Sequence, residues 1–93
     1  MSQNTVTRTV VVLHGNGLCM RGASAVCHLA DEFESKIDLV KDGQSVSTTD
    51  ALEVVLLAAE CGSQLEVEAT GPDAEEAVDA LTKLFAERFG LPG

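Results

Sequence analysis

The stretch of sequence that decides the fold reads His14-Gly15-Asn16-Gly17-Leu18-Cys19-Met20-Arg21-Gly22-Ala23. It follows a run of β-branched residues and precedes apolar residues at helical spacing, so we predict a strand, a glycine turn and the start of a helix. Unpaired N–H groups at a helix N-terminus hold anions such as phosphate. A thiol and a guanidinium delivered there by Cys19 and Arg21 therefore suit a site that acquires or recognises an anionic group.

Periodicity predicts that strands and helices alternate along the rest of the chain. Asp50 is expected to cap the second helix, and Gly62 to close it in a left-handed conformation. The last helix is expected to start at 71–73 and to stop at Gly90 and Pro92. The order β-α-β-β-α-β-α, with one strand that is polar on alternate residues, predicts an α+β sandwich of two layers. The strands are expected at residues 6–13, 37–40, 44–47 and 65–70, and the first two helices at residues 20–33 and 51–59.

Composition limits the classes of function. The 93 residues suffice for one domain, residues 1–93, and carry 15 acidic and 6 basic side chains, a net charge of −9. That balance disfavours nucleic-acid binding, which requires basic residues to neutralise phosphates. No apolar run reaches the ~20 residues that cross a bilayer, and the first residues do not resemble a secretion signal, so we expect a cytoplasmic protein without membrane contact.

The three cysteines are odd in number and lack C-x-x-C spacing, which indicates reduced thiols rather than a disulfide framework or a zinc ribbon. Cys19 and His14 together would supply too few ligands for a stable metal site, and we expect neither metal nor cofactor. Cys27 continues the apolar stripe of the first helix and is expected in the core. Cys61 is expected as an exposed loop thiol, and His28 as a solvated side chain.

The element order and the turn sequence together resemble the HPr family, the phosphocarrier of the bacterial phosphoenolpyruvate-dependent sugar phosphotransferase system. The family's active-site pattern Asn-Gly-Leu-His-x-Arg-Pro-Ala is matched at residues 16–18, at Arg21 and at Ala23, and similarity extends over roughly residues 6–89, including Gly43, 58–63 and 71–77. The resemblance implies an open-faced β-sandwich in which three helices cover one face of an antiparallel sheet of order 1-4-2-3. It also implies a carrier that is not itself an enzyme.

The departures from the family pattern fall on its functional positions. Cys19 stands where the family has the histidine that enzyme I phosphorylates, and Gly22 stands where the family has a helix-opening proline. Arg21 resembles the arginine that pairs with the phosphate. Asp50 stands where many members have a regulatory serine, and so places a permanent negative charge where phosphoserine would sit.

Cys19 has two readings. A thiol at a helix N-terminus beside an arginine should have a lowered pKa and be a competent nucleophile, with His14 either as a base or as an ordinary surface residue. The alternative is a small side chain that fills the place of a lost catalytic group.

The second helix is apolar nearly all round, so part of it should face solvent. In the family the corresponding exposed patch docks partner proteins, and Leu52 and Val55, with Met20, are the candidates here. The alternative is extra burial in a small core.

These observations favour an HPr-like phosphocarrier or regulatory protein that lacks histidine phosphotransfer and acts by binding partners. The partners implied are enzyme I, IIA-type domains or a regulated protein. The alternatives are a phosphate carrier or a redox switch that uses the Cys19 thiol, and a domain that serves only for docking.

Overall fold

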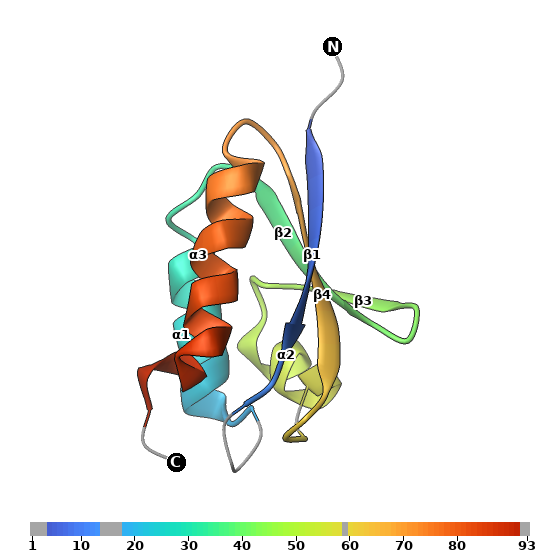
Figure 1. Cartoon of the computed structure of the whole chain (residues 1–93), viewed down its shortest axis with the longest axis vertical. Coiled ribbons are helices and arrows are strands. Elements are labelled where there is room, and N and C mark those ends of the chain that lie inside the picture. Colours follow the sequence, from blue (N-terminus) through green and yellow to red (C-terminus); the bar gives the residue numbers. More distant parts are fainter. Residues whose placement is uncertain (1–3, 14–17, 59, 92–93) are drawn as a thin grey trace.

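The computed structural model describes residues 4–13, 18–58 and 60–91. Its elements follow the expected order β-α-β-β-α-β-α, and a short 3₁₀ turn is added after the last helix (Figure 1). The elements are β1 (Thr5–Val11), α1 (Met20–Ala30), β2 (Lys36–Lys41), β3 (Gln44–Ser47), α2 (Ala51–Ala58), β4 (Gln64–Thr70), α3 (Ala74–Ala86) and the turn η1 (Arg88–Gly90).

The four strands form one antiparallel sheet in the order β1-β4-β2-β3, as expected. The last strand along the chain lies in the interior of the sheet, where it pairs with β1 on one side and β2 on the other. Val67 of β4 lies opposite Leu39 of β2, and Leu65 lies opposite Val10 of β1. Because side chains alternate across a strand, this register places the apolar residues of all three strands on one face.

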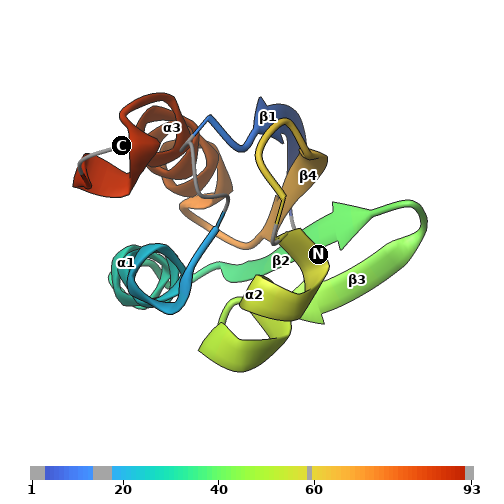
Figure 2. The same ribbon diagram turned by 90° about the horizontal axis from the view of Figure 1, so that it is seen from below.

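The helices cover that apolar face, and the opposite face of the sheet is open (Figures 1 and 2). The core lies between the two layers, and its largest fully buried side chain is Phe85 of α3. Glu66, on the open face, is exposed. The arrangement confirms the two-layer α+β sandwich, with α1 and α2 lying side by side.

The first helix is shorter than predicted. It ends at Ala30 rather than at residue 33, because Asp31 takes the C-cap position and donates its amide to the carbonyl of Cys27. Phe33 still packs against the core from the following loop. Because Phe33 is apolar and falls at helical spacing from Ala30, the sequence predicted one helical turn more than the structure has.

Gly62 does not close the second helix, so that prediction was wrong. The helix α2 ends at Ala58, and Gly62, with φ of +88°, lies in the turn that leads to β4. Its amide donates to the carbonyl of Val12 at 2.7 Å, and the amide of Val12 donates to the carbonyl of Ser63 at 2.9 Å. The left-handed glycine thus extends the pairing of β1 with β4 and fixes the chain just before the glycine turn.

The last helix begins at Ala74, two residues after Pro72, so the proline precedes the helix instead of lying in its first turn. Asp73 takes the N-cap position without capping the helix. Its carboxylate accepts bonds from the amides of Glu34 and Ser35, each at 2.9 Å, and from the Ser35 hydroxyl. The start of α3 is therefore fastened to the loop between α1 and β2.

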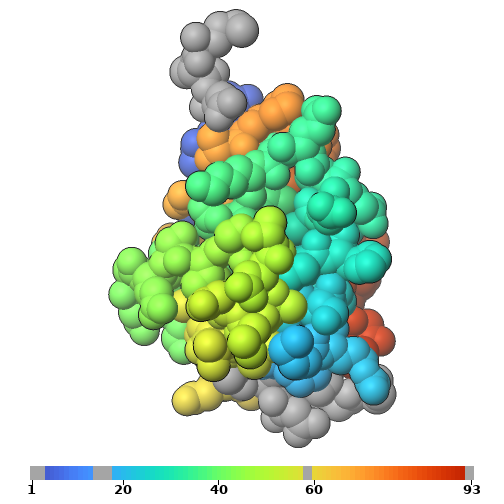
Figure 3. All heavy atoms as spheres, turned by 180° about the vertical axis from the view of Figure 1, so that it is seen from behind, coloured from blue at the N-terminus to red at the C-terminus, as the bar shows by residue number. Residues whose placement is uncertain are grey.

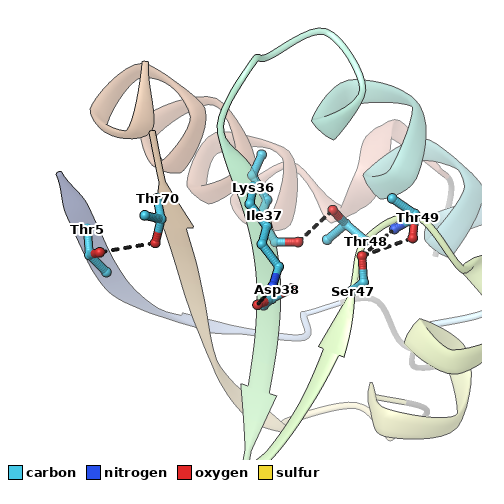
Figure 4. Close-up of polar contacts among 8 residues, drawn as sticks. All are labelled: Thr5, Lys36, Ile37, Asp38, Ser47, Thr48, Thr49 and Thr70. Carbon is cyan, nitrogen blue, oxygen red and sulfur yellow. Dashed lines mark hydrogen bonds and ion pairs between the residues drawn. The ribbon is translucent and has the colours of Figure 1, made fainter. Parts of the chain in front are cut away.

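The loop between β3 and α2 is held by hydroxyl groups (Figure 4). The Thr48 hydroxyl is buried and donates to the carbonyl of Ile37 at 2.9 Å. The Ser47 hydroxyl oxygen accepts the amide of Thr49 at 3.2 Å. These bonds fix the place at which Asp50 begins the second helix.

Candidate functional site

Cys19 is the N-cap residue of α1. Its backbone is extended, with φ of −87° and ψ of 175°, and its carbonyl accepts the amide of Ala23 at 2.9 Å. Leu18, just before it, is 1% exposed and anchors the segment in the core. The thiol is partly exposed and makes no capping hydrogen bond within the described part of the chain. The Cys19 side chain thus leaves the first amides of the helix without a capping bond of its own, and those amides face the side on which an anion would bind.

The pKa of the Cys19 thiol is lowered. The amide of Gly22 in the first turn is the main cause, the amide and the positive charge of Arg21 add to it, and partial burial opposes it. Negative charge on sulfur is stabilised by the positive end of the helix dipole. The direction of the shift is the one expected for a thiol in this position.

Arg21 lies exposed in the same first turn. A cation is disfavoured at the start of a helix unless an anion is bound there. Among the residues that the structure describes, the ion pairs join Arg8 to Asp79 and Lys36 to Asp38, and neither involves Arg21. The guanidinium and the open amides are therefore suited to the same negatively charged group.

Gly22 is buried beneath two apolar side chains. A Cβ atom at this position would lie 3.0 Å from Cδ1 of Leu18 and 3.2 Å from Cδ2 of Phe89. Phe89, which lies far along the chain, thus packs onto the first turn of α1. Sequence reasoning missed this residue: Phe89 continues the helical spacing of Leu81 and Phe85, but its contact with Gly22 depends on a turn at the end of α3 that brings it onto α1.

Asp50 caps α2 as predicted. Its carboxylate Oδ1 accepts the amides of Leu52 at 3.1 Å and Glu53 at 3.3 Å. Its charge also reaches α1: the pKa of Cys27 is raised, mainly by burial and further by Asp50. One negative charge therefore stabilises α2 and disfavours ionisation of the thiol in the middle of α1.

The three predicted thiol environments differ as expected. Cys27 is partly buried and packs against the core, and Cys61 is exposed. His28 is exposed as well. His14 lies outside the described residues, so its expected approach to Cys19 stays a prediction.

An apolar patch flanks the site. Among the described residues, the large apolar side chains of Leu13, Met20, Leu52 and Leu56 are 44%, 51%, 59% and 69% exposed, and we call Met20, Leu52 and Leu56, on the adjacent helices α1 and α2, the patch. The expected exposure of Met20 and Leu52 is confirmed. Leu56, the most exposed of the four, was left out of the predicted set.

Val55, which was in the predicted set, is partly buried and packs against the core. Figure 3 shows the face on which the start of α1 lies beside α2. Two helices thus contribute apolar side chains to one surface next to Cys19.

One pocket in the described part of the chain lies apart from Cys19 and Arg21. A pocket of about 460 Å³ lies between α1 and the loop after β3, and its lining includes Cys27, His28 and Thr49. Neither Cys19 nor Arg21 lines it.

Two further features concern the described residues only. None of the helices there is both long and apolar enough to cross a membrane. No three acidic, histidine or cysteine side chains in the described ranges are grouped so that they could hold a metal ion.

Comparison with known proteins gives a consistent result along the chain. The family model described as "PTS HPr component phosphorylation site" matches residues 6–87. A phosphocarrier protein HPr from Treponema pallidum is 39% identical over 84 residues, which cover 90% of this chain and 96% of the relative. One from Cupriavidus necator is 36% identical and covers 89% and 93%.

The fold agrees as well. The crystal structure of HPr-C-His from Thermoanaerobacter tengcongensis superimposes with a TM-score of 0.86 at 28% identity, covering 95% of this chain and 99% of that one. The match to the family model includes both Cys19 and Asp50 within its range.

Proposed function

The chain belongs to the HPr family of phosphotransferase-system phosphocarrier proteins, and from this membership we propose that it acts by binding partner proteins at the surface around Cys19, without carrying phosphate on a histidine. The observation that carries the proposal is the apolar patch. Exposed leucines on α2 adjoin Met20 at the start of α1. The two relatives described above bear the name of phosphocarrier protein HPr.

The patch supports docking for an energetic reason. Leaving a leucine in water forgoes about 1.5–3 kcal/mol that its burial would contribute. Leu52 and Leu56 are 59% and 69% exposed, although the chain has a core in which leucines could be buried. A partner that covers both side chains recovers part of that free energy, and the neighbouring Arg21 adds recognition of an acidic or phosphorylated group. The partners we propose are enzyme I, IIA-type domains or a regulated protein of the same system.

Asp50 supports a regulatory version of this role. It stands at the start of α2, directly before the patch, and its carboxylate is held by two amides of that helix. We infer that this fixed charge takes the part of a regulatory phosphoserine, and that no kinase is needed to set it.

The docking proposal is tested by titrating enzyme I and IIA-type domains from the same organism against the protein in a calorimeter. Leu52→Asp should weaken binding by about tenfold or more, because it places a charge in the centre of the buried contact. Thr7→Asp, on the open face of the sheet opposite the helices, adds the same charge away from the patch and is the control. Equal binding by both variants would contradict the proposal.

A second candidate function is a phosphate carrier that uses the Cys19 thiol. The specific observation in its favour is the lowered pKa of that thiol beside open helix amides and Arg21. In the transfer, the thiolate sulfur attacks the phosphorus of phosphohistidine on enzyme I. The S–P bond forms as the N–P bond breaks, and the imidazole nitrogen keeps the electron pair and takes up a proton.

Mass spectrometry after incubation with enzyme I and phosphoenolpyruvate separates the two candidates. A gain of one phosphoryl group that Cys19→Ala abolishes supports the carrier, whereas no gain supports docking alone. His14→Ala is the matched control for labelling at the nearby histidine. Under the docking proposal, Cys19→Ala leaves the calorimetric binding unchanged.

A redox or thiol switch remains the third reading of Cys19. It requires a reversible oxidation of the same thiolate, and peroxide treatment followed by reduction would reveal it as a reversible loss of alkylation at Cys19. Insensitivity of Cys19 to peroxide would remove this reading.

A further inference from the structure

The turn η1 at the end of the chain has an unusual backbone. Three successive residues, Arg88, Phe89 and Gly90, have positive φ angles of 54°, 60° and 70°. Side chains larger than hydrogen disfavour this conformation, and it persists only where the surroundings enforce it. Such a conformation at two residues with side chains calls for a structural reason.

The reason lies in the contacts of Phe89. Its side chain is 4% exposed and packs edge to face on Phe85 of α3, with ring centroids 5.0 Å apart. Its Cδ2 and Cγ atoms also approach Gly22, at 3.2 and 3.3 Å from where a Cβ would stand. The left-handed backbone therefore aims the ring of Phe89 at the first turn of α1.

Arg88 reaches the other end of the same segment. Its Nε donates to the backbone carbonyl of Leu13, at 3.4 Å. Leu13 precedes the segment that carries Cys19, and Gly22 follows it. One turn of the chain thus contacts both ends of the stretch that holds the thiol.

We propose that Phe89 and Arg88 are positioning residues for Cys19: they hold the first turn of α1 so that its amides face the thiol. Phe89 fixes the backbone at Gly22 by packing, and Arg88 fixes the approach of the chain at Leu13. The inference rests on the proposed function only in taking Cys19 as the reacting group of the site.

The proposal also gives Gly22 a specific role. A glycine permits the ring of Phe89 to approach the backbone of the helix, where a side chain would push either Phe89 or Leu18 aside. The contact then takes the place of the rigidity that a proline provides at the start of a helix. Gly22 and Phe89 together make one packing unit at the site.

The test is the pH profile of Cys19 alkylation by iodoacetamide, resolved by site with mass spectrometry on the full chain. Phe89→Ala should shift the midpoint of the profile upward, and lower the rate at pH 7 about threefold, which corresponds to half a pKa unit. Phe33→Ala is the matched control, since Phe33 also packs partly on the core but lies after the other end of α1. Its profile should match that of the wild type.

Two further variants guard against simple unfolding. Phe89→Leu keeps most of the core packing and should give a smaller shift in the same direction, while Arg88→Lys keeps the charge and loses the Nε bond to Leu13. An unchanged Cys19 profile in folded Phe89→Ala or Phe89→Leu, or an equal shift in Phe33→Ala, overturns the proposal. Because alkylation requires no phosphate donor, failure of the phosphorylation experiment leaves this result independent.

Discussion

Two neighbouring helices of this protein begin in opposite ways. At the start of α2, the carboxylate of Asp50 accepts the amides of Leu52 and Glu53, so the positive end of the helix is occupied by a permanent charge. At the start of α1, Cys19 occupies the same N-cap position in an extended conformation and makes no capping bond. The start of α2 is thus capped by a side chain, which we call a filled start, and the start of α1 is not, which we call an open start.

The capped start of α2 contributes to the stability of the fold, whereas the uncapped start of α1 is suited to reactivity at Cys19. A filled start contributes about 1 kcal/mol to folding and leaves nothing for a ligand to do. An open start forgoes that contribution, and its amides instead stabilise a thiolate or an incoming anion. The protein thus keeps its weaker helix start at the place where we propose that partners bind.

The largest effect we expect concerns the two thiols of α1. At pH 7 Cys19 should react with iodoacetamide about tenfold or more faster than Cys27, because the first lies at the open start and the second is partly buried near Asp50. The Cys19 pKa is lowered and the Cys27 pKa is raised, so the ratio should shrink as the pH rises toward the ionisation of Cys27. Site-resolved mass spectrometry measures both rates in one sample, and equal rates at pH 7 would break the comparison.

The next effect concerns the filled start. Asp50→Ala should lower the free energy of unfolding by about 1 kcal/mol, since two amides lose their acceptor. Urea denaturation followed by circular dichroism measures the change. Asp50→Asn keeps an oxygen acceptor and should lose less, and an equal loss in both variants would show that the charge, rather than the cap, carries the effect.

The converse substitution fills the open start. Cys19→Asp should raise the free energy of unfolding by about 0.5–1 kcal/mol, because the backbone at residue 19 already has the extended conformation of a capping residue and Arg21 is near. Cys19→Ala provides neither cap nor charge and is the control. A Cys19→Asp variant no more stable than Cys19→Ala would show that the first-turn amides are not available.

The smallest effect at neutral pH is expected at a third helix start. Asp73→Asn keeps one acceptor oxygen, and its loss of stability should therefore be slight. The pKa of Asp73 is lowered, first by the hydroxyl of Ser35 and then by the amide of Glu34. A carboxyl whose pKa is lower in the folded chain contributes stability above the ordinary aspartate value of about 3.9, and this is lost as the pH falls through the folded value.

Thermal melting of the Asp73→Asn variant and the wild type across pH checks this sign. The gap in Tm should be present at neutral pH and close in acid. A gap that widens as the pH falls would contradict the assignment.

Much of the fold follows from residues that repeat with a clear period. The alternation of Val10 in β1 with Val12 just after it, and of Leu65 with Val67 in β4, predicted the buried face of the sheet correctly. Asp50 was correctly predicted as a cap, because a cap depends only on residues next to it in sequence. Local physical chemistry suffices for such features.

Features that depend on distant contacts could not be predicted in this way. Asp73 is a residue type that often caps helices, yet its carboxylate accepts the amides of Glu34 and Ser35, which are distant in sequence. Gly62 was predicted to close a helix and instead extends a strand pair through Val12. Phe89 continues the helical spacing of Leu81 and Phe85, yet α3 ends at Ala86, and the contact of Phe89 with Gly22 depends on the turn that follows.

The position of β4 has a consequence for biosynthesis. This strand supplies the partner for β1, and it also pairs with β2. A nascent chain that ends before residue 64 therefore offers β1 nothing to pair with, and a hairpin of β2 and β3 alone is marginally stable in water. The sheet can close only when the residues up to Thr70 have left the ribosome. The surface that carries Cys19 and the leucines of α2 therefore assembles on its sheet only after β4 has emerged.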